Sequence, residues 1–363
     1  MEHVLRTAKV LGWYKIHSSG GKIYKNIKHM FLLNICKEFE YKYEQHNIPL
    51  SPSHKNMLTI LLATYNGEKY LAAQLDSLLA QTYTNFTVRA HDDASTDATW
   101  DILNEYKSCY PNKFHLTRSA TNSGSAKENF LSLITTARDD YLMLCDQDDI
   151  WLPSKIEHTM AKMKAMEKRH PNTPLLVHTD LQVVDQHLNV INPSFRQHTK
   201  RNYNRRAFHQ VLNINNATGC TIMYNLALAK LLTKPPKHCV MHDWWLKLVA
   251  IAFGKIDHVS EATMLYRQHG QNACGAKDVR RLSYKLNRLI NGKELRAVLH
   301  ETCRQAGCLL EIYPHMLTAS QKSLLQSYSA IPQMGKLRRV LTLIRLRTVM
   351  PCLSRNIALF MFI

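Results

Sequence analysis

Apolar and polar positions alternate in two distinct ways between residues 57 and 185. Short runs rich in apolar residues, typical of strands, lie at 57–63, 86–90, 113–117 and 141–145. Between them, apolar residues recur every three or four positions, which predicts helices within 68–81, 91–106 and 124–138. This alternation predicts an α/β fold with a mostly parallel central sheet flanked by helices, the arrangement of a Rossmann-like nucleotide-binding domain.

The pattern is less regular in the second half of the chain. Strands are expected at 174–184 and 219–224, a helix at 242–253, and a strand leading into a loop at 256–269. After Gly275 the apolar spacing becomes helical and the segment becomes basic. The expected organisation is therefore a domain at 57–275 between a basic N-terminal extension, 1–56, and a basic helical C-terminal region, 276–363.

Positive charge is concentrated at the two ends of the chain. The net charge is +19; residues 276–363 carry 15 Lys and Arg against 4 Asp and Glu, and residues 1–56 carry 9 against 4. Basic ends indicate contact with a polyanion, either a nucleic acid or an anionic membrane surface. A nucleic-acid binder would be expected to carry a reading motif and to have its charge on the sheet domain, so we expect no nucleic-acid partner.

The tail at 335–363 combines Leu, Ile, Met and Phe with six Lys and Arg residues. It is too interrupted by charge to span a bilayer, but it suits a helix lying at a membrane interface. A helix packed on its own domain, with an Arg-rich face in solvent, fits the same sequence. The N-terminal residues lack the apolar run of a signal peptide. We therefore expect a cytoplasmic protein, peripheral on the inner face of the cell membrane.

Three carboxylates follow the fourth apolar run. Asp146 and Asp148 are separated by one residue, so in an extended backbone their side chains point the same way while Gln147 turns aside. Two converging carboxylates repel each other unless a cation lies between them, and Mg²⁺ or Mn²⁺ carried with phosphates takes such oxygen ligands. Surface loops also produce this motif, but its position after a buried strand favours a ligand site. Asp149 is expected to cap the following helix or to bond within it.

Polar residues also follow the second and third strands, and in open α/β sheets ligands bind beyond the carboxyl ends of the strands. Asp92 or Asp93 could accept hydrogen bonds from a ribose or a base. The same stretch could simply be a loop before a helix capped by Ser95 or Thr96. Lys127 follows a glycine-containing turn and could reach a phosphate.

The stretch MHDWWL at residues 241–246 is a second candidate site. Asp243 could act as a general base in an aromatic setting. Trp244 or Trp245 could stack its indole face on a sugar ring at the acceptor side. Tryptophan at helical spacing is also common in protein cores, so the sequence favours a site-lining pair and a core pair equally.

Seven stretches resemble, in order and rough spacing, the inverting family 2 glycosyltransferases with a GT-A fold. They are ATYNGEKYLAAQLDSLLAQTY, HDDASTDATW, NSGSAKENF, CDQDDIWLPSKI, NATGCTIMYN, HDWWL and YRQHGQN. The likeness covers about Met57 to Gly275, and it extends to bacterial rhamnosyltransferase-like members that build surface polysaccharides. One departure is Ala94, where many members have glycine; it changes the freedom of the loop but removes no reactive group.

The resemblance implies a role for each matched residue. Nucleotide contacts are expected from Thr64, Tyr65, Asn66, Asp92 and Asp93, with Lys127 near the diphosphate. Asp148 is the expected direct ligand of Mn²⁺ or Mg²⁺, and Asp146, the second metal candidate, lies nearer the ribose or donor sugar. His269 assists the metal or the diphosphate, with support from Arg267. Asp243 takes a proton from the acceptor hydroxyl as that hydroxyl attacks the anomeric carbon.

The implied function is transfer of a sugar from a nucleotide-diphosphate donor to a lipid-linked oligosaccharide of a surface polysaccharide. The motifs favour dTDP-rhamnose as the donor, with UDP-glucose and UDP-galactose as alternatives. A metal-dependent phosphatase of the haloacid-dehalogenase type also begins from a D-x-D motif after a buried strand. That chemistry expects Thr or Val where this chain has Ile150, and it expects the motif near the start of its domain.

Overall fold

The computed structural model describes residues 57–270, 292–349 and 353–363. The expected N-terminal extension and the boundary expected at Gly275 lie outside these residues. The first four apolar runs form strands close to the predicted bounds: β1 (Leu58–Thr64), β2 (Phe86–Asp92), β3 (Phe114–Arg118) and β4 (Tyr141–Cys145). Further strands are β5 (Ile150–Trp151), β6 (Leu175–Val184), β7 (Val190–Asn192), β8 (Ile222–Asn225) and β9 (Lys255–Arg267).

The helices alternate with these strands, as the sequence predicts. Those of the sheet domain are α3 (Leu71–Leu79), α4 (Thr99–Cys109), α5 (Ala126–Thr136), α6 (Lys155–Arg169), α7 (Phe195–Thr199), α8 (Phe208–Val211), α9 (Leu226–Ala229) and α10 (His242–Phe253), with a 3-10 turn, η1, at Gly219–Thr221. The C-terminal helices are α12 (Gly292–Ile312), α13 (Ala319–Ser329), α14 (Lys336–Arg345) and α15 (Leu353–Phe362). The predicted α/β class is confirmed.

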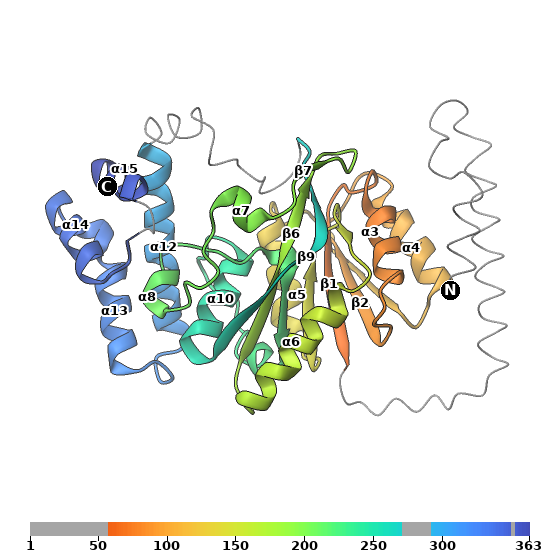
Figure 1. Ribbon diagram of the computed structural model, residues 1–363, viewed down its shortest axis with the longest axis horizontal. Coiled ribbons are helices and arrows are strands. Elements are labelled where there is room, and N and C mark those ends of the chain that lie inside the picture. The colour runs from red at the N-terminus through yellow and green to blue at the C-terminus, as the bar shows by residue number, and fades with distance from the viewer. Residues whose placement is uncertain (1–56, 271–291, 350–352) are drawn as a thin grey trace. The chain divides into compact units, whose positions relative to one another are not determined.

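The strands form one sheet in the order β3-β2-β1-β4-β8-β6-β9-β5, with β7 paired to β6. β1 pairs in parallel with β2 and with β4, β2 pairs in parallel with β3, and β6 pairs in parallel with β9. β8 runs antiparallel between β4 and β6, and the short β5 runs antiparallel to β9. The sheet is therefore mostly parallel, and the carboxyl ends of β1, β2 and β4 meet at one edge (Figure 1).

Both faces of the sheet are buried at its central strands β1 and β4, which explains why these two read as nearly continuous apolar runs, whereas β2 and β3 toward the edge are more polar. Along β1, Leu61 and Ala63 belong to an apolar cluster shared with α5 and α10. Leu58, Ile60 and Leu62, on the opposite face, belong to a cluster shared with α3, α4 and α6. The residues of β1 thus pack under helices on both faces, and the loop at the end of this strand is held on a rigid base.

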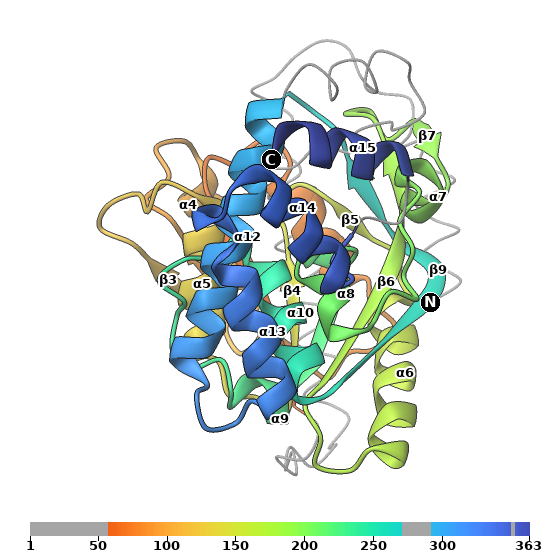
Figure 2. The same ribbon diagram turned by 90° about the vertical axis from the view of Figure 1, so that its left-hand side faces the viewer.

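The C-terminal region is helical, as expected, and it shares a core with the sheet domain. Leu309 of α12 and Leu325 of α13 belong to the same apolar cluster as Leu248 of α10. The ring of Tyr313 lies 6.4 Å from that of Trp245, and its hydroxyl donates to the Leu231 carbonyl at 2.7 Å. Helices α12 and α13 lie side by side (Figure 2). The described C-terminal helices therefore complete one compact unit with the sheet.

Two local predictions about helix caps are wrong. The N-cap of α4 is Ala98, and neither Ser95 nor Thr96 caps this helix. The Asp97 carboxylate accepts a hydrogen bond from the Thr99 amide at 3.0 Å in their place. Asp149 does not cap α6 either; it accepts from the backbone amide of Arg267 at 3.0 Å. The first contact is local, between residues two apart, whereas the second joins the loop after β4 to the end of β9.

Candidate active site

The loops after β1 and β2 are fastened to each other around Asp92. The Asp92 carboxylate accepts from the Thr64 hydroxyl and from the Ser95 amide, each at 3.1 Å, and lies 3.1 Å from the Arg118 guanidinium. Asp92 and Thr64 are both buried. Asp92 thus joins the loops after β1 and β2 and the end of β3, and its predicted nucleotide contact stays a prediction.

Asn66 holds the same two loops together from the other side. Its backbone is left-handed, with φ of 47°, a conformation that asparagine tolerates better than most residues. Its side-chain oxygen accepts from the Thr96 backbone amide at 2.8 Å, and the backbone amide of Asn66 donates to the Ser95 hydroxyl at 2.9 Å. The neighbouring Tyr65 is 45% exposed. Tyr65 is therefore the aromatic group that this braced loop presents to solvent.

Asp93 and Ala94 shape the next part of the edge. Asp93 accepts from the Ser123 amide at 2.9 Å and from its hydroxyl at 2.7 Å, which ties the loop before α5 to the end of β2. Ala94 has a φ of 58°, and a left-handed backbone costs a residue with a Cβ atom about 1–2 kcal/mol. That conformation accounts for the glycine that many family members have at this position.

Lys127 lies in the first turn of α5, close to the start of α10. Its ammonium group lies 3.1 Å from the Glu128 carboxylate and 3.5 Å from the Cys239 carbonyl. The structure therefore links Lys127 to the segment before Asp243. Among the described residues, the Lys127 ammonium group forms no hydrogen bond or ion pair with the acidic loop after β4.

Gln147, between the two aspartates, joins the loop after β4 to the loop after β1. Its side chain accepts from the Tyr65 amide at 2.8 Å and donates to the Tyr65 carbonyl at 2.9 Å. Sequence reasoning assigned Gln147 no role, and only the alternation of side chains suggested that it turns aside. A Cβ atom at Gly67 would lie 2.3 Å from the Gln147 side-chain oxygen, so a side chain at position 67 excludes Gln147 from its place.

Gly67→Ala is expected to displace Gln147 and to break both of its bonds to Tyr65. Because the end of the Gln147 side chain can swing away, the fold should survive, and the loss should fall on donor binding. We expect an increase in the KM for the donor of about 10-fold, the cost of roughly one or two hydrogen bonds, with a smaller change in kcat. Gln147→Ala should reproduce this result. A Gly67→Ala enzyme with the KM of the parent would contradict it.

The Asp148 carboxylate meets His269 at the end of β9. The His269 Nε2 atom lies 2.7 Å from an Asp148 oxygen. Arg267 donates to the Asp148 carbonyl at 2.8 Å, and its guanidinium lies 4.6 Å from the centre of the Tyr70 ring. The Tyr70 ring lies 4.8 Å from that of His269. Three residues that the sequence singled out thus come together, and Tyr70 joins them without any signal in the local pattern.

Asp146 points to a different set of groups. The strand ends at Cys145 and the chain bends at residues 147 and 148, so the expectation that Asp146 and Asp148 share one face of an extended strand is not met. Among the described residues, the metal-type ligand atoms that gather within 4.8 Å are those of Asp146, Asp149 and Cys220. Burial, then the charge of Asp148, and also that of Asp243, raises the pKa of Asp146 to about 7. Asp146 thus lies within electrostatic range of both other candidate carboxylates.

Asp243 lies in the first turn of α10, where η1 packs closely against it. A Cβ atom at Gly219 would lie 3.6 Å from the Asp243 Cβ atom and 2.8 Å from the His242 Nε2 atom, so only glycine fits there. The His242 ring stacks on Phe130 at 4.2 Å, and burial lowers its pKa to about 4. A neutral, packed His242 therefore fixes the start of α10. Asp243 itself is 9% exposed.

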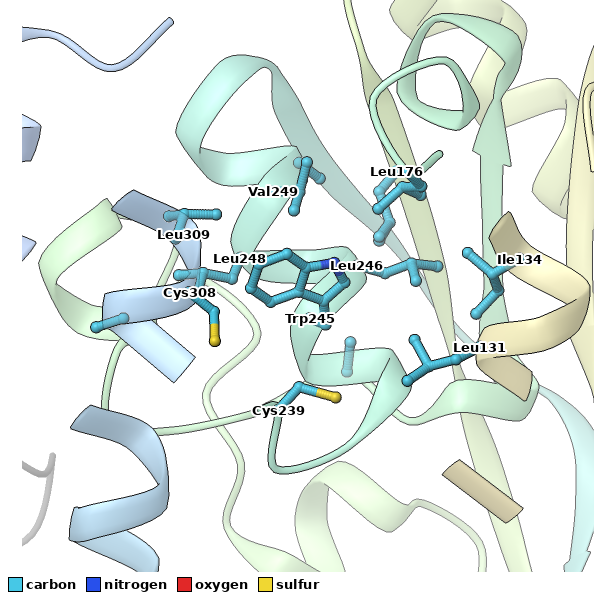
Figure 3. Packing of buried hydrophobic residues seen from close by; sticks show 14 of the residues in the cluster. Leu131, Ile134, Leu176, Cys239, Trp245, Leu246, Leu248, Val249, Cys308 and Leu309 are labelled. Atoms are coloured by element: carbon cyan, nitrogen blue, oxygen red, sulfur yellow. The ribbon is translucent and has the colours of Figure 1, made fainter. Parts of the chain in front are cut away.

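The two tryptophans after Asp243 are packed within the protein. Trp245 is 1% exposed, and Figure 3 shows its indole among apolar side chains of α5, α12 and β6. The Trp244 indole nitrogen donates to the Val211 carbonyl at 2.7 Å, and this side chain is 7% exposed. Stacking on a sugar needs a free indole face, and Trp245 has none. The core interpretation is therefore the correct one for Trp245.

Lys247 lies one turn after Asp243 and is 1% exposed. Burial, then the positive charge of Arg201, lowers its pKa to about 7 from the usual 10.5 of a lysine. In the described part of the chain no residue gives its ammonium group a hydrogen bond or an ion pair. Because the folded pKa is depressed, the folded state binds fewer protons than the unfolded chain between pH 7 and 10.5, so stability rises with pH in that window.

Lys247→Met is expected to stabilise the protein at pH 7 and below by about 1–3 kcal/mol, because it removes a buried charge that lacks a partner. The gain should shrink as the pH rises from 7 and vanish near pH 10.5, where the lysine is neutral in both states. Urea midpoints of the parent and the variant at several pH values measure this. A variant that is less stable at pH 7, or a gain that does not change with pH, would contradict the prediction.

The candidate site combines the acidic loop after β4 with one separate, largely buried carboxylate, that of Asp243. The ends of β1, β2 and β4 form the loops around Tyr65, Gln147 and Asp148, and β9 supplies His269. Asp243 lies on α10. Besides burial, the charges of Asp148 and Asp243 both raise the pKa of Asp146. Such an edge can bind a diphosphate with a hard cation, while a separate carboxylate accepts a proton.

Three comparisons relate this chain to known proteins. The model of the family described as glycosyl transferase family 2 matches residues 59–230. The dTDP-rhamnosyl transferase RfbG of Shigella flexneri is 27% identical over 246 residues, 65% of this chain and 81% of that protein. The UDP-Glc:alpha-D-GlcNAc-diphosphoundecaprenol beta-1,3-glucosyltransferase WfaP of Escherichia coli is 31% identical over 112 residues, 30% of this chain and 41% of that protein.

Among solved structures, S. aureus TarS 1-349 in complex with UDP-GlcNAc has a TM-score of 0.47 and 17% identity, over 84% of this chain and 90% of that chain. The matched segment spans most of RfbG but less than half of WfaP. The family match runs from β1 to just past α9 and includes the loops around Tyr65, Asp92 and Asp148. Residues 59–230 thus carry a glycosyl transferase family 2 domain, and the chain is a glycosyltransferase enzyme.

Proposed function

We propose that this enzyme transfers a hexose, with L-rhamnose from dTDP-rhamnose favoured, to a lipid-linked oligosaccharide at the inner face of the cell membrane, with inversion. One observation carries the proposal: Asp148 meets His269 at 2.7 Å, beside an Asp146 that both Asp148 and Asp243 influence. Gly219 packs against Asp243, and its neighbour Cys220 lies within 4.8 Å of Asp146, which links the proposed base to the loop proposed to hold the diphosphate. The alternative of a metal-dependent phosphatase is wrong, because the family is one of glycosyltransferases.

A divalent cation, Mn²⁺ or Mg²⁺, fits the residues at this edge. Asp148 and His269 offer an oxygen and an imidazole nitrogen, a donor set suited to Mn²⁺. Burial, then the charge of Asp148, raises the pKa of Asp146, and a cation bound nearby would favour its charged form. Asp148 and His269 would hold the ion, with Asp146 as a further candidate. When bound, the ion supplies positive charge to the diphosphate as it leaves.

The protein's own groups then account for the remaining chemistry. The exposed Tyr65 ring lies beside the braced loops and is suited to stack on the nucleobase. Asp243 accepts the proton of the acceptor hydroxyl, whose oxygen forms a bond to the anomeric carbon as the bond from that carbon to the diphosphate oxygen breaks. Attack from the face opposite the leaving group inverts the anomeric configuration.

Two relatives support the choice of substrates. The name of RfbG gives a dTDP-rhamnosyl transfer, and the match covers most of that protein, which favours dTDP-rhamnose here. The name of WfaP gives a UDP-Glc donor and a diphosphoundecaprenol-linked acceptor. That acceptor supports a lipid-linked substrate for this enzyme as well. The same name makes UDP-glucose the second candidate donor, with UDP-galactose beside it.

Donor identity can be tested by binding before any acceptor is known. The thermal midpoint of the purified full chain would be measured with Mn²⁺ and each of dTDP-rhamnose, UDP-glucose and UDP-galactose. We expect the largest rise with dTDP-rhamnose, since bound ligand stabilises the folded state by mass action. A larger rise with a UDP-sugar would replace the donor, and no rise with any of the three would remove all of them.

A further inference from the structure

Helices α14 and α15 lie on the outer side of α12 and α13, away from the sheet (Figures 1 and 2). Each buries one side: Leu343 of α14 and Leu359 of α15 belong to the core cluster. The tail is therefore packed on its own domain, as one of the two sequence interpretations held. Packing uses only part of the apolar surface of these helices, and the rest faces outward.

Five outward apolar side chains form the feature that we call the α14–α15 patch. They are Leu337 at 74% exposed, Leu341 at 57%, Ile344 at 51%, Ile357 at 49% and Met361 at 55%. The three on α14 are spaced by four and three residues, so they lie on one face of that helix. Lys336 donates from its ammonium group to the Met361 carbonyl at 2.8 Å, which joins the start of α14 to the end of α15. Exposed apolar surface of this kind marks an interaction site.

The segment that carries the α14–α15 patch has charged residues of one sign only. Residues 336–363 contain six Lys and Arg and no Asp or Glu. Lys336, Arg338 and Arg345 are exposed, and each is adjacent in sequence to a residue of the patch. None of the helices that the structure describes is both long enough and apolar enough to cross a membrane. Apolar side chains beside unopposed positive charge are typical of a helix lying on a membrane surface.

We propose that the α14–α15 patch docks the enzyme on a bilayer of anionic phospholipid, with Leu337, Leu341 and Ile344 entering the interface. The absence of acidic residues complements the negative lipid surface. A nucleic acid would satisfy the charge but would leave the apolar side chains in water, so a lipid surface explains both features.

Two further contacts connect this surface with the catalytic side of the molecule. At the end of α14, the Thr348 carbonyl accepts from Asn213 and the Val349 carbonyl accepts from Arg205, each at 3.0 Å. Two residues before Asn213, the Val211 carbonyl accepts from Trp244, the neighbour of Asp243. These contacts link the start of α10, where the proposed base lies, to the segment after α14 through residues 205–213. The role of the base rests on the proposed function, whereas docking itself does not.

The test uses the full chain and vesicles of phosphatidylcholine, either alone or mixed with phosphatidylglycerol, without any sugar donor. We expect flotation with the anionic vesicles, weakened by salt, and little with phosphatidylcholine alone. The triple variant Leu337→Ser, Leu341→Ser, Ile344→Ser should bind anionic vesicles at least about 10-fold more weakly than the parent. Arg338→Gln with Arg345→Gln should weaken binding by about 10-fold and reduce its salt dependence.

A matched control replaces exposed apolar residues elsewhere. Leu188→Ser, Val190→Ser and Ile191→Ser removes side chains that are 38%, 57% and 51% exposed near β7, and should leave flotation unchanged. Equal flotation of the α14 triple variant and the parent, or no flotation of the parent, would overturn the proposal. So would a parent dimer that the α14 triple variant dissociates in the absence of lipid, since a second copy would then cover the patch. Vesicle binding by an enzyme that uses no donor would overturn only the proposed function.

Discussion

Asp243→Asn is expected to lower the rate of sugar transfer by about 10²- to 10⁴-fold, the range that a general base contributes. The amide matches the carboxylate in size and can keep the place of Asp243 beside Gly219 and at the start of α10. It cannot accept the proton of the acceptor hydroxyl. Donor binding, measured by thermal shift with Mn²⁺, should therefore stay within about 3-fold of the parent because the donor contacts are untouched.

Asp101→Asn is a suitable control, because it makes the same chemical change away from the site. Asp101 is exposed in the first turn of α4. Its transfer rate should equal that of the parent. An Asp243→Asn enzyme with at least half of the parental rate would show that another group takes the proton. Loss of donor binding together with activity would instead show that Asp243 supports the fold or the donor.

Asp148→Asn should cost about 10²- to 10³-fold in kcat, the loss typical when one electrostatic stabiliser of a developing charge is removed. The amide can still accept or donate a hydrogen bond to His269, so the pairing at the end of β9 should persist. What it loses is the negative charge that favours a divalent cation. The concentration of Mn²⁺ needed for half of the maximal rate should therefore rise by about 10-fold or more.

His269→Gln provides an independent test of the same site. It should also raise the Mn²⁺ requirement, because the imidazole nitrogen lies 2.7 Å from Asp148. Asp101→Asn should leave the metal titration curve of the parent unchanged. If Asp148→Asn keeps the parental Mn²⁺ requirement and rate, the proposed metal-binding role of Asp148 is wrong.

The central strands were predictable because their apolar runs have a single physical cause. Residues such as Leu61 and Leu62 on β1 face opposite sides of the sheet, and helices bury both sides. An unbroken apolar run is the only pattern that this arrangement permits, so the strand bounds follow from the sequence. The polar residues at the strand ends, Asp148 and His269 among them, could be assigned to a site on the same grounds.

Contacts between distant residues could not be predicted in this way. The sequence suggested a nucleotide contact for Asp92, but not that its carboxylate also binds Arg118 from β3 and Thr64 from β1. Asp149 resembled a helix cap, yet its partner is the Arg267 amide, 118 residues away in the sequence. The spacing of Trp245 could not distinguish a core residue from a sugar platform, because its cover comes from distant segments, α5 before it and α12 after residue 292. Local patterns carry no information about such partners.

Release of nucleoside diphosphate tests the central claim most directly. The purified enzyme would be incubated with dTDP-rhamnose, UDP-glucose or UDP-galactose and a lipid extract as the acceptor source, with Mn²⁺ or with a chelator. We predict release from at least one donor with Mn²⁺, and little with the chelator or in the Asp243→Asn variant. Equal release with Mn²⁺ and with the chelator, or no release from any donor, would contradict a metal-dependent sugar transfer at Asp148 and Asp243.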